Sequence, residues 1–293
     1  MALIFKKSRM LLAVVVSFLA PWAALGQNQP PQDPPTDLVK SVIYNELHPA
    51  TIANIYWKYR LHKDAGGRHE TRVVVETKSG SLDRLVSVAG EPLTKAQQRD
   101  ESRRILRFST DPDEQRKAEQ ARRKDSDQCN AILKMIPEAF TFAYAGQNSN
   151  AIELTFRPNP KFQPPTRAGK VLQQMAGDMW VDRRQKRLIS INGRLVNEVK
   201  FGGGLLGHLE KGGEFTVKRA ELAPGDWEMT ELTVNMRGRA LLFKNISVQQ
   251  KEIHSHFERV PDSLTLADAA NMLLHQVLVA SDVHETSGAK GAP

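Results

Sequence analysis

The sequence predicts a mainly β protein with flanking helices, of the α+β class. We expect a curved antiparallel sheet of about ten or eleven strands that forms an open or half barrel around a helix and carries a charged helical insertion. Segments of alternating apolar and polar residues recur between residues 55 and 260, turn residues separate them, and apolar stripes at helical spacing lie near both ends. A sheet this long cannot stay flat, so it should curl and bury one face.

The N-terminus predicts an exported protein. Lys6, Lys7 and Arg9 precede an apolar run at residues 10–20, and small residues follow it up to Gly26. The run is about half of the roughly 20 residues that a membrane helix needs, so residues 1–26 are interpreted as a signal peptide, cleaved before Gln27. We expect a soluble protein in the periplasm or the extracellular medium, with no retained membrane span.

Composition narrows the range of partners. The formal net charge is +8, but residues 1–26 carry three of the basic residues and no acidic one, so +5 remains after cleavage. This modest charge on an exported chain does not favour nucleic acid, and we expect no nucleic-acid partner. The single cysteine, Cys129, excludes a disulfide scaffold.

The domain organisation follows from local composition. Residues 27–35 form a polar, Pro-rich leader and residues 281–293 a polar tail, and neither can bury a core. One domain is therefore expected over residues 36–280. Its first helix should be capped by Thr36 or Asp37 and end near residue 48, and three strands in a meander should follow between residues 55 and 88.

A charged helical insertion is predicted over residues 94–136. Its first part alternates basic and acidic residues, and Pro112 should divide it into two helices, with Thr110 or Asp111 as the cap of the second. Opposite charges four residues apart are typical of an exposed helix. The last part, from Cys129 to Ile136, is predicted to be mostly buried, with a buried structural thiol.

Strands should return at residue 140 and continue to about residue 260, and a helix should follow. The four residues from Thr265 to Asp268 have the form of a capping box, and an apolar stripe runs from Leu266 to Leu278. This helix must bury its stripe against the sheet.

Two motifs suggest chemistry. The stretch Gly202 to Gly207 fits G-x-G-x-x-G but leaves no room for the helix that would hold a pyrophosphate, so we interpret it as a bend between strands. His254 and His256 lie two residues apart in a predicted strand, near Glu258, and are weak candidates for metal ligands. No motif of a catalytic nucleophile or phosphate loop is present, so we expect neither an enzyme nor a cofactor.

The assembled plan resembles the half-barrel fold of periplasmic lipoprotein carriers and sensors, the LolA/LolB/RseB group, over about residues 36–280. The segments Phe201 to Phe215 and Gly238 to Lys244 are also similar to a family of bacterial secreted proteins. The resemblance implies a curved sheet, covered by helices, that encloses an apolar cavity for acyl chains. It transfers no individual binding residue.

The leading hypothesis is a non-catalytic binding protein that holds a lipid or a lipoprotein acyl chain in the half barrel. The candidate lining residues are apolar or aromatic members of the predicted strands: Trp57, Tyr59, Phe142, Ile191 and Phe201. The first alternative is an envelope scaffold, interaction or sensor protein without a small ligand, and the second is a metal-dependent enzyme that uses His254 and His256. We expect a monomer that can contact a membrane peripherally.

Overall fold

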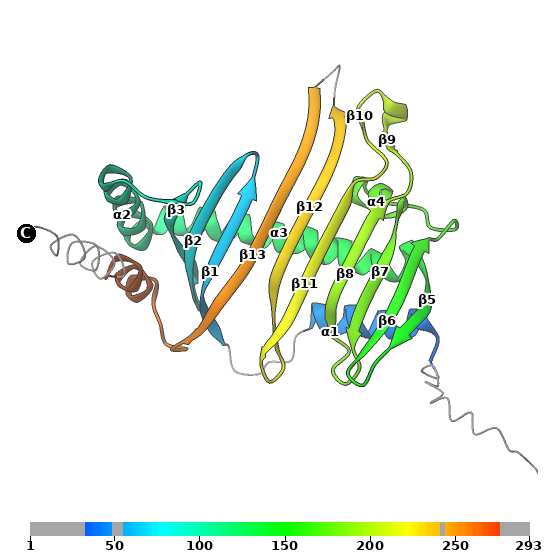
Figure 1. The fold of residues 1–293 in the computed structure, drawn as a ribbon, viewed down its shortest axis with the longest axis horizontal. Coiled ribbons are helices and arrows are strands. Elements are labelled where there is room, and N and C mark those ends of the chain that lie inside the picture. Colours follow the sequence, from blue (N-terminus) through cyan, green and yellow to red (C-terminus); the bar gives the residue numbers. More distant parts are fainter. Residues whose placement is uncertain (1–32, 49–54, 241–243, 276–293) are drawn as a thin grey trace, which may run out of the picture. The chain divides into compact units, whose positions relative to one another are not determined.

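The computed structural model describes residues 33–48, 55–240 and 244–275 (Figure 1). The predicted signal peptide, leader residues 27–32 and the tail at 281–293 lie outside these ranges. No helix in the described part of the chain combines the length and the hydrophobicity needed to span a membrane.

One open antiparallel sheet of thirteen strands dominates the fold, in the order β4-β3-β2-β1-β13-β12-β11-β8-β7-β6-β5, with β10 and β9 added beside β12. The predicted fold class is confirmed; the two or three strands beyond the predicted number are accounted for by very short strands, which give no alternation signal. The strands are β1 (Tyr56–Ala65), β2 (Arg68–Thr77), β3 (Gly80–Val88), β4 (Glu91–Pro92), β5 (Phe140–Gln147), β6 (Ala151–Pro158), β7 (Met175–Asp182), β8 (Leu188–Leu195), β9 (Val199–Phe201), β10 (Gly207–Leu209), β11 (Glu214–Ala223), β12 (Asp226–Ala240) and β13 (Lys244–Val260).

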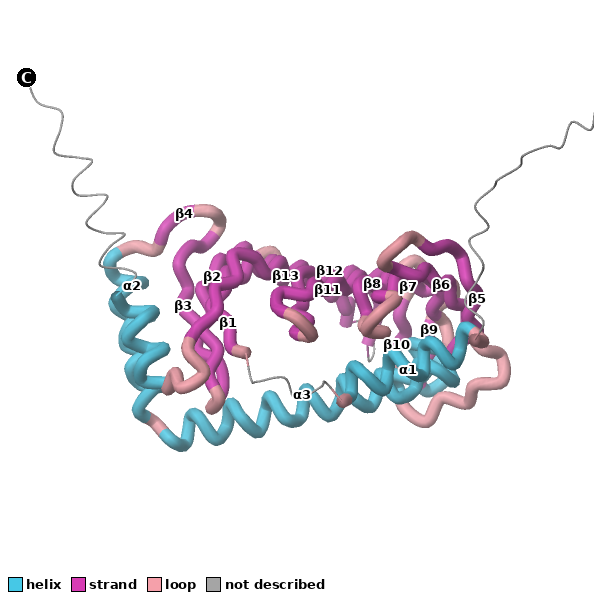
Figure 2. Tube along the Cα trace, turned by 90° about the horizontal axis from the view of Figure 1, so that it is seen from below, coloured by secondary structure: helices cyan, strands magenta, loops and turns pink. Residues whose placement is uncertain are grey.

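The first and last strands of the chain are neighbours in the sheet. β1 pairs with β13, so the two edges of the sheet are β4 and β5, which are consecutive along the chain. The predicted insertion, α2 (Lys95–Thr110) and α3 (Pro112–Ala139), therefore connects one edge of the sheet to the other. At 1.5 Å per residue the 28 residues of α3 are about 42 Å long, which is most of the roughly 48 Å that eleven strands span. Figure 2 shows α3 running along one face of the curved sheet, from α2 towards β5.

Local sequence explains where these two helices begin. Thr94 and Gln97 form a capping box at the start of α2, and the Asp111 carboxylate accepts hydrogen bonds from the N–H groups of Asp113 (2.8 Å) and Glu114 (3.1 Å). The prediction that Asp111 caps the second helix is confirmed. The cap of α1 (Pro35–Leu47) was predicted incorrectly: α1 begins at Pro35, one residue before Thr36, and no side chain caps it.

Two apolar clusters stabilise the sheet, one at each end and on opposite faces. The first lies on the face that α1 and α3 cover, here called the inner face, where α1, the C-terminal end of α3 and α4 (Arg167–Leu172) pack near β5 to β8. The second lies on the outer face of β2 and β3, under α2 and the helix at residues 266–275. Val74 and Val75 alternate in direction, as neighbours in a strand must, and only Val75 belongs to the second cluster.

This arrangement changes two predictions. The sheet does not bury a single face, because the C-terminal helix, whose predicted capping box is present, packs on the outer face. The expectation of a buried thiol was wrong, since Cys129 is exposed. Buried positions of α3 begin only at Ile136, with Leu133 partly buried against the first cluster, so Cys129 lies beyond the region that the core covers.

Candidate functional site

The inner face changes from charged to apolar across the sheet. In an antiparallel sheet, directly opposite residues share a face, so the pairing register identifies each row of side chains. One row crosses nine strands from β2 to β5 and consists of Glu70, Lys63, Glu252, Leu232, Val217, Ile191, Met179, Leu154 and Tyr144. Its first three members are charged, and those from Leu232 to Leu154 are apolar. The inner face is therefore amphipathic along its width.

Three of the five predicted lining residues lie at the apolar end. Ile191 belongs to the buried first cluster, and Phe142 and Phe201 are partly buried against it. Phe142 stacks edge-on against Phe140, at a centroid separation of 6.1 Å. These side chains pack against α1 and α3, so they form part of the core of the fold.

Among the residues that the structure describes, no packed side chains fully cover the middle of the inner face. Leu61, Leu232, Val234 and Phe257 are partly exposed and belong to neither apolar cluster. Where α3 crosses this region, every residue from 120 to 129 is exposed, around almost three turns of helix. The helix is held at its two ends, by α2 on one side and by α1, α4 and β5 on the other. Apolar sheet surface thus remains available to a ligand between the two clusters.

Trp57 and Tyr59, the other two predicted lining residues, lie at the charged end on β1. Trp57 is buried, and its indole Nε1 donates a hydrogen bond to Asp226 Oδ2 (2.8 Å). The Tyr59 ring stacks on the imidazole of His254 at 5.0 Å and contacts Phe257 at 5.2 Å. Burial, and then the negative charge of Glu76, raise the pKa of Tyr59, so its phenol stays protonated and able to donate a hydrogen bond.

Carboxylates gather beside these aromatic rings. Burial, followed by the charges of Glu76 and Asp226, raises the pKa of Glu228 to about 7. Burial also raises the pKa of Glu76, although its carboxylate accepts a hydrogen bond from the backbone N–H of Trp57 (3.1 Å). If all of these carboxyl groups were ionised, their negative charge would exceed the positive charge of the cations nearby. Protonation of Glu228 near neutral pH is the physical response.

An ion-paired group adjoins this cluster and ties α1 to the sheet. Glu46, near the end of α1, accepts hydrogen bonds from Arg219 and from the backbone N–H of Leu188 (3.0 Å), and its carboxylate lies 3.2 Å from Arg187 Nη2. Burial lowers the pKa of Arg187, while the charge of Glu46 opposes this effect. These residues position α1 and do not form a free binding surface.

In a regular strand, residues two apart share one face, so His254 and His256 were expected on the same side of the sheet. The structure separates them. A β-bulge places both His256 and Phe257 opposite Tyr59, and His256 adopts a left-handed backbone conformation with φ of 56°. His254 therefore lies on the inner face with Phe257, whereas His256 is exposed. Within the described ranges, no group of three or more His, Cys, Asp or Glu side chains is arranged to hold a metal ion.

The Nε2 atom of His254 is buried and has no hydrogen-bond partner among the described residues. It lies 3.9 Å from Glu252 Oε2, which is too long for a hydrogen bond. The neighbouring His254 and Lys63, whose Nζ lies 2.6 Å from Glu252, lower the pKa of Glu252 to about 2. A polar group of a ligand could complete the hydrogen bonding of His254.

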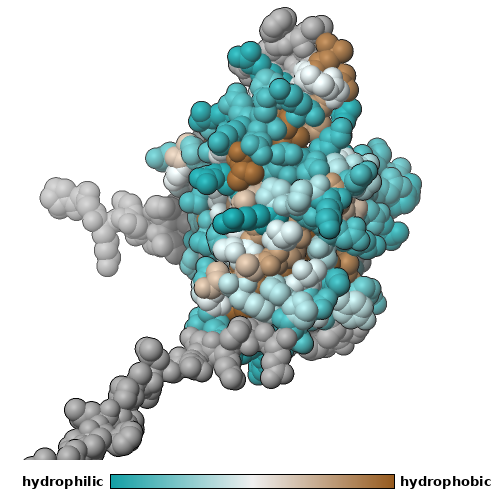
Figure 3. Space-filling view, turned by 90° about the vertical axis from the view of Figure 1, so that its right-hand side faces the viewer, coloured by the Kyte–Doolittle hydropathy of each residue, from teal (hydrophilic) through white to brown (hydrophobic). Residues whose placement is uncertain are grey.

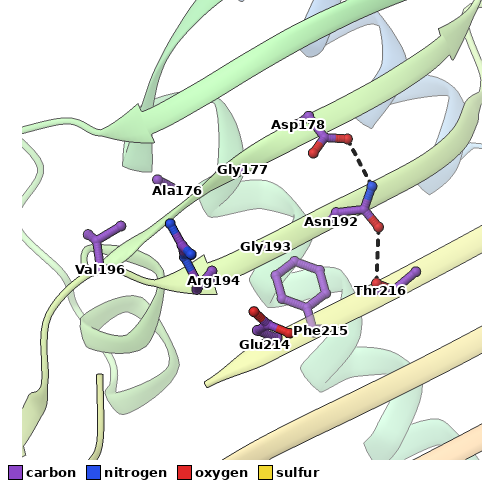
Figure 4. Close-up of a pocket in the computed structure, with 10 residues that line it drawn as sticks. All are labelled: Ala176, Gly177, Asp178, Asn192, Gly193, Arg194, Val196, Glu214, Phe215 and Thr216. Atoms are coloured by element: carbon purple, nitrogen blue, oxygen red, sulfur yellow. Dashed lines mark hydrogen bonds between the residues drawn. The ribbon is translucent and has the colours of Figure 1, made fainter. Parts of the chain in front are cut away.

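A pocket of about 390 Å³ lies on β7, β8 and β11 (Figure 4). Asn192 links the strands across it, donating a hydrogen bond to Asp178 (2.8 Å) and accepting one from Thr216 (3.0 Å). These three outer-face side chains hydrogen-bond to one another, and none of them is a predicted site residue. The pocket offers a polar surface without a nucleophile next to a base.

Sequence reasoning missed the carboxylates of the inner face. Glu76 follows three valines, and Glu228 and Asp226 flank Trp227, with no spacing that connects β2 to β12. Only the pairing of β1 with β13 brings these strands close together.

Comparison with known proteins gives no further assignment: no protein-family model, curated protein or solved structure matches the chain.

Proposed function

We propose that the chain is an exported, non-catalytic binding protein that holds a hydrophobic ligand, a lipid or the acyl chain of a lipoprotein, against the inner face of its half barrel. One observation carries the proposal. Between the two apolar clusters, Leu61, Leu232, Val234 and Phe257 remain partly exposed beneath a helix whose residues 120–129 are exposed on every side. Sheet surface of this kind is stabilised when an apolar ligand covers it.

The change from charged to apolar side chains across the inner face would fix the orientation of the ligand. Its apolar part would lie over β11 and β12, where Val217, Leu232 and Val234 follow one another. Its polar part would lie over β1 and β13, where His254 Nε2 has no hydrogen-bond partner among the described atoms and the Tyr59 phenol stays protonated. An amphipathic lipid has both parts, and the resemblance to the LolA/LolB/RseB group supports the same class of ligand.

Native mass spectrometry tests the proposal on chain recovered after export, with and without added palmitate or a triacylated lipopeptide. We expect a mass increase equal to one ligand. Val234→Asp places a carboxylate on the inner face and should weaken binding at least tenfold. Thr233→Asp is the matched control, because Thr233 is the adjacent residue on the outer face, opposite Lys251 and Thr216. No uptake of either ligand, or equal uptake by the two variants, would contradict the proposal.

One observation favours a second function, that of an envelope scaffold or sensor without a small ligand. The first half of α3 carries ion pairs such as Glu119 with Arg123, and it borders a pocket of about 670 Å³ beside the β2–β3 turn. A charged surface of this type suits a protein partner. Reversing Arg116 and Arg123 to Glu should then abolish capture of that partner without changing the thermal unfolding midpoint. Unchanged capture would exclude this surface as the contact.

A further inference from the structure

A short hairpin at one end of the sheet presents two leucines to solvent. β9 and β10 pair with each other, and the turn between them contains the 3₁₀ segment Gly202–Gly204 and then Leu205 and Leu206. All three glycines have positive φ, between 57° and 98°, a conformation that other residues rarely adopt. The glycine-rich stretch thus forms a tight turn that displays the leucines.

The leucines are unusually exposed for their type. Leu205 is 76% exposed and Leu206 45%, so together they leave slightly more than one whole leucine side chain in water. Figure 3 shows a few apolar residues near the upper end of the molecule, where Figure 1 places β9, β10 and the ends of β12 and β13, within a mainly polar surface. Two adjacent leucines exposed at one tip are a candidate contact site, although their area is smaller than that of a typical protein-binding patch.

The hairpin beneath the leucines is firmly attached. β10 pairs with β12 from Gly207 to Leu209, and Phe201 and Leu209 pack against the first apolar cluster. Val199 is buried there as well. The leucines are therefore presented by an anchored element.

Basic side chains form the row next to the tip. Lys200, His208 and Arg239 are directly opposite one another on β9, β10 and β12, so they share one face. Lys200 is paired with Glu198 (2.7 Å), whereas Arg239 and Arg237 form no ion pair with any residue that the structure describes. Two cations thus remain near the tip: Arg239 in this row, and Arg237 two residues further along β12, where its carbonyl accepts a hydrogen bond from the Glu210 N–H (2.8 Å).

We propose that this tip docks on the surface of an anionic lipid bilayer, with Leu205 and Leu206 entering the interface and Arg237 and Arg239 contacting lipid headgroups. Apolar residues flanked by cations are the combination that binds such a surface. Two leucines are far smaller than the roughly 800 Å² per partner of a stable protein–protein interface, which disfavours a protein as the occupant. The docking does not depend on a ligand on the inner face.

Vesicle co-sedimentation tests the docking, using chain recovered after export whose N-terminus has been determined by mass spectrometry. We expect binding to vesicles of phosphatidylglycerol and phosphatidylcholine at a ratio of 3:7, and weaker binding to phosphatidylcholine alone. Leu205→Ser with Leu206→Ser should lower the partition coefficient roughly fiftyfold, from the apolar area removed. Arg237→Ala with Arg239→Ala should lower it about twentyfold at low salt. Leu106→Ser is the matched control, because Leu106 is similarly exposed, on α2.

A second variant keeps the test independent of folding. Leu205→Trp should retain binding, and its emission should shift to shorter wavelength when anionic vesicles are added. Unchanged partition of the double leucine variant, or no binding of the unmodified chain to anionic vesicles, would overturn the docking. So would dissociation of a dimer by the leucine substitutions without any effect on vesicle binding, since the tip would then contact a second copy. Loss of vesicle binding with normal lipid uptake would leave the proposed function intact.

Discussion

Replacing Glu228 with Gln should change how the stability of the protein depends on pH. The Glu228 carboxyl lies on β12, and burial and the charges of Glu76 and Asp226 raise its pKa from 4.5 to about 7. Between pH 4.5 and 7 the folded chain keeps a proton that the unfolded chain has lost. Raising the pH through this window therefore lowers the free energy of unfolding, and above pH 7 the full penalty is present.

The size of the effect follows from the same values. At 1.36 kcal/mol per pH unit, a rise of the pKa from 4.5 to about 7 amounts to about 3 kcal/mol. Glu228 is only partly buried, so solvent screening reduces this, and we expect about 2 kcal/mol. Glu228→Gln cannot ionise, so it should be more stable than the unmodified chain by about this amount at pH 8.5 and by little at pH 5.

Urea unfolding followed by tryptophan fluorescence measures the difference at both pH values. Glu231→Gln is the matched control, because Glu231 is on the same strand but pairs with Lys218 (2.8 Å), which lowers the pKa of Glu231. Its carboxylate stabilises the fold at high pH, so this variant should be slightly less stable at pH 8.5. A difference between Glu228→Gln and the unmodified chain that does not vary with pH would refute the reasoning.

Three further substitutions test the contacts of α1 with the sheet and the packing of the two apolar clusters. Glu46→Gln removes the charge that buried Arg187 and partly buried Arg219 share, and should destabilise the fold by about 3 kcal/mol in urea unfolding; a loss below about 1 kcal/mol would show that water replaces Glu46 as the partner of the arginines. Ile105→Ala in the second cluster should cost about 2–4 kcal/mol, whereas Leu106→Ala, its exposed neighbour, should cost about 0.5 kcal/mol or less; equal losses would contradict the assigned packing. Gly193→Ala makes a methyl group clash with the Phe215 ring and should lower the thermal midpoint by several degrees, and an unchanged midpoint would contradict this contact.

Local patterns predicted most elements, because the residues that determine them are close in sequence. Alternation between Ile55 and Leu61 indicates β1, and Asp111 and Pro112 mark the boundary of α2 and α3. The pairing of β1 with β13 is different, since it joins residues almost 200 positions apart. Without it, the 28 residues of α3 look like an insertion, and their role as a connection between the two edges of the sheet is hidden.

The candidate site was predicted only in part for the same reason. The sequence assigns apolar and aromatic residues to strands. It does not distinguish residues that pack in the core, such as Ile191, from residues on the uncovered part of the sheet, such as Val234. The β-bulge at His256 reverses which side chains of β13 face inward, and no glycine or other turn residue in the sequence marks its position. Burial of Glu76 and Glu228 depends on strands that are distant in sequence, so their raised pKa values have no signature in the sequence.

Photo-crosslinking locates the ligand most directly. A fatty acid with a diazirine near the end of its chain is added to the full chain, activated by light, and the modified peptides are identified by mass spectrometry. We expect modification on β11, β12 and β13 around Val217, Leu232 and Val234, and on α3 between residues 120 and 129. Modification confined to the outer face, to the β9–β10 tip, or absent altogether would contradict a ligand held on the inner face.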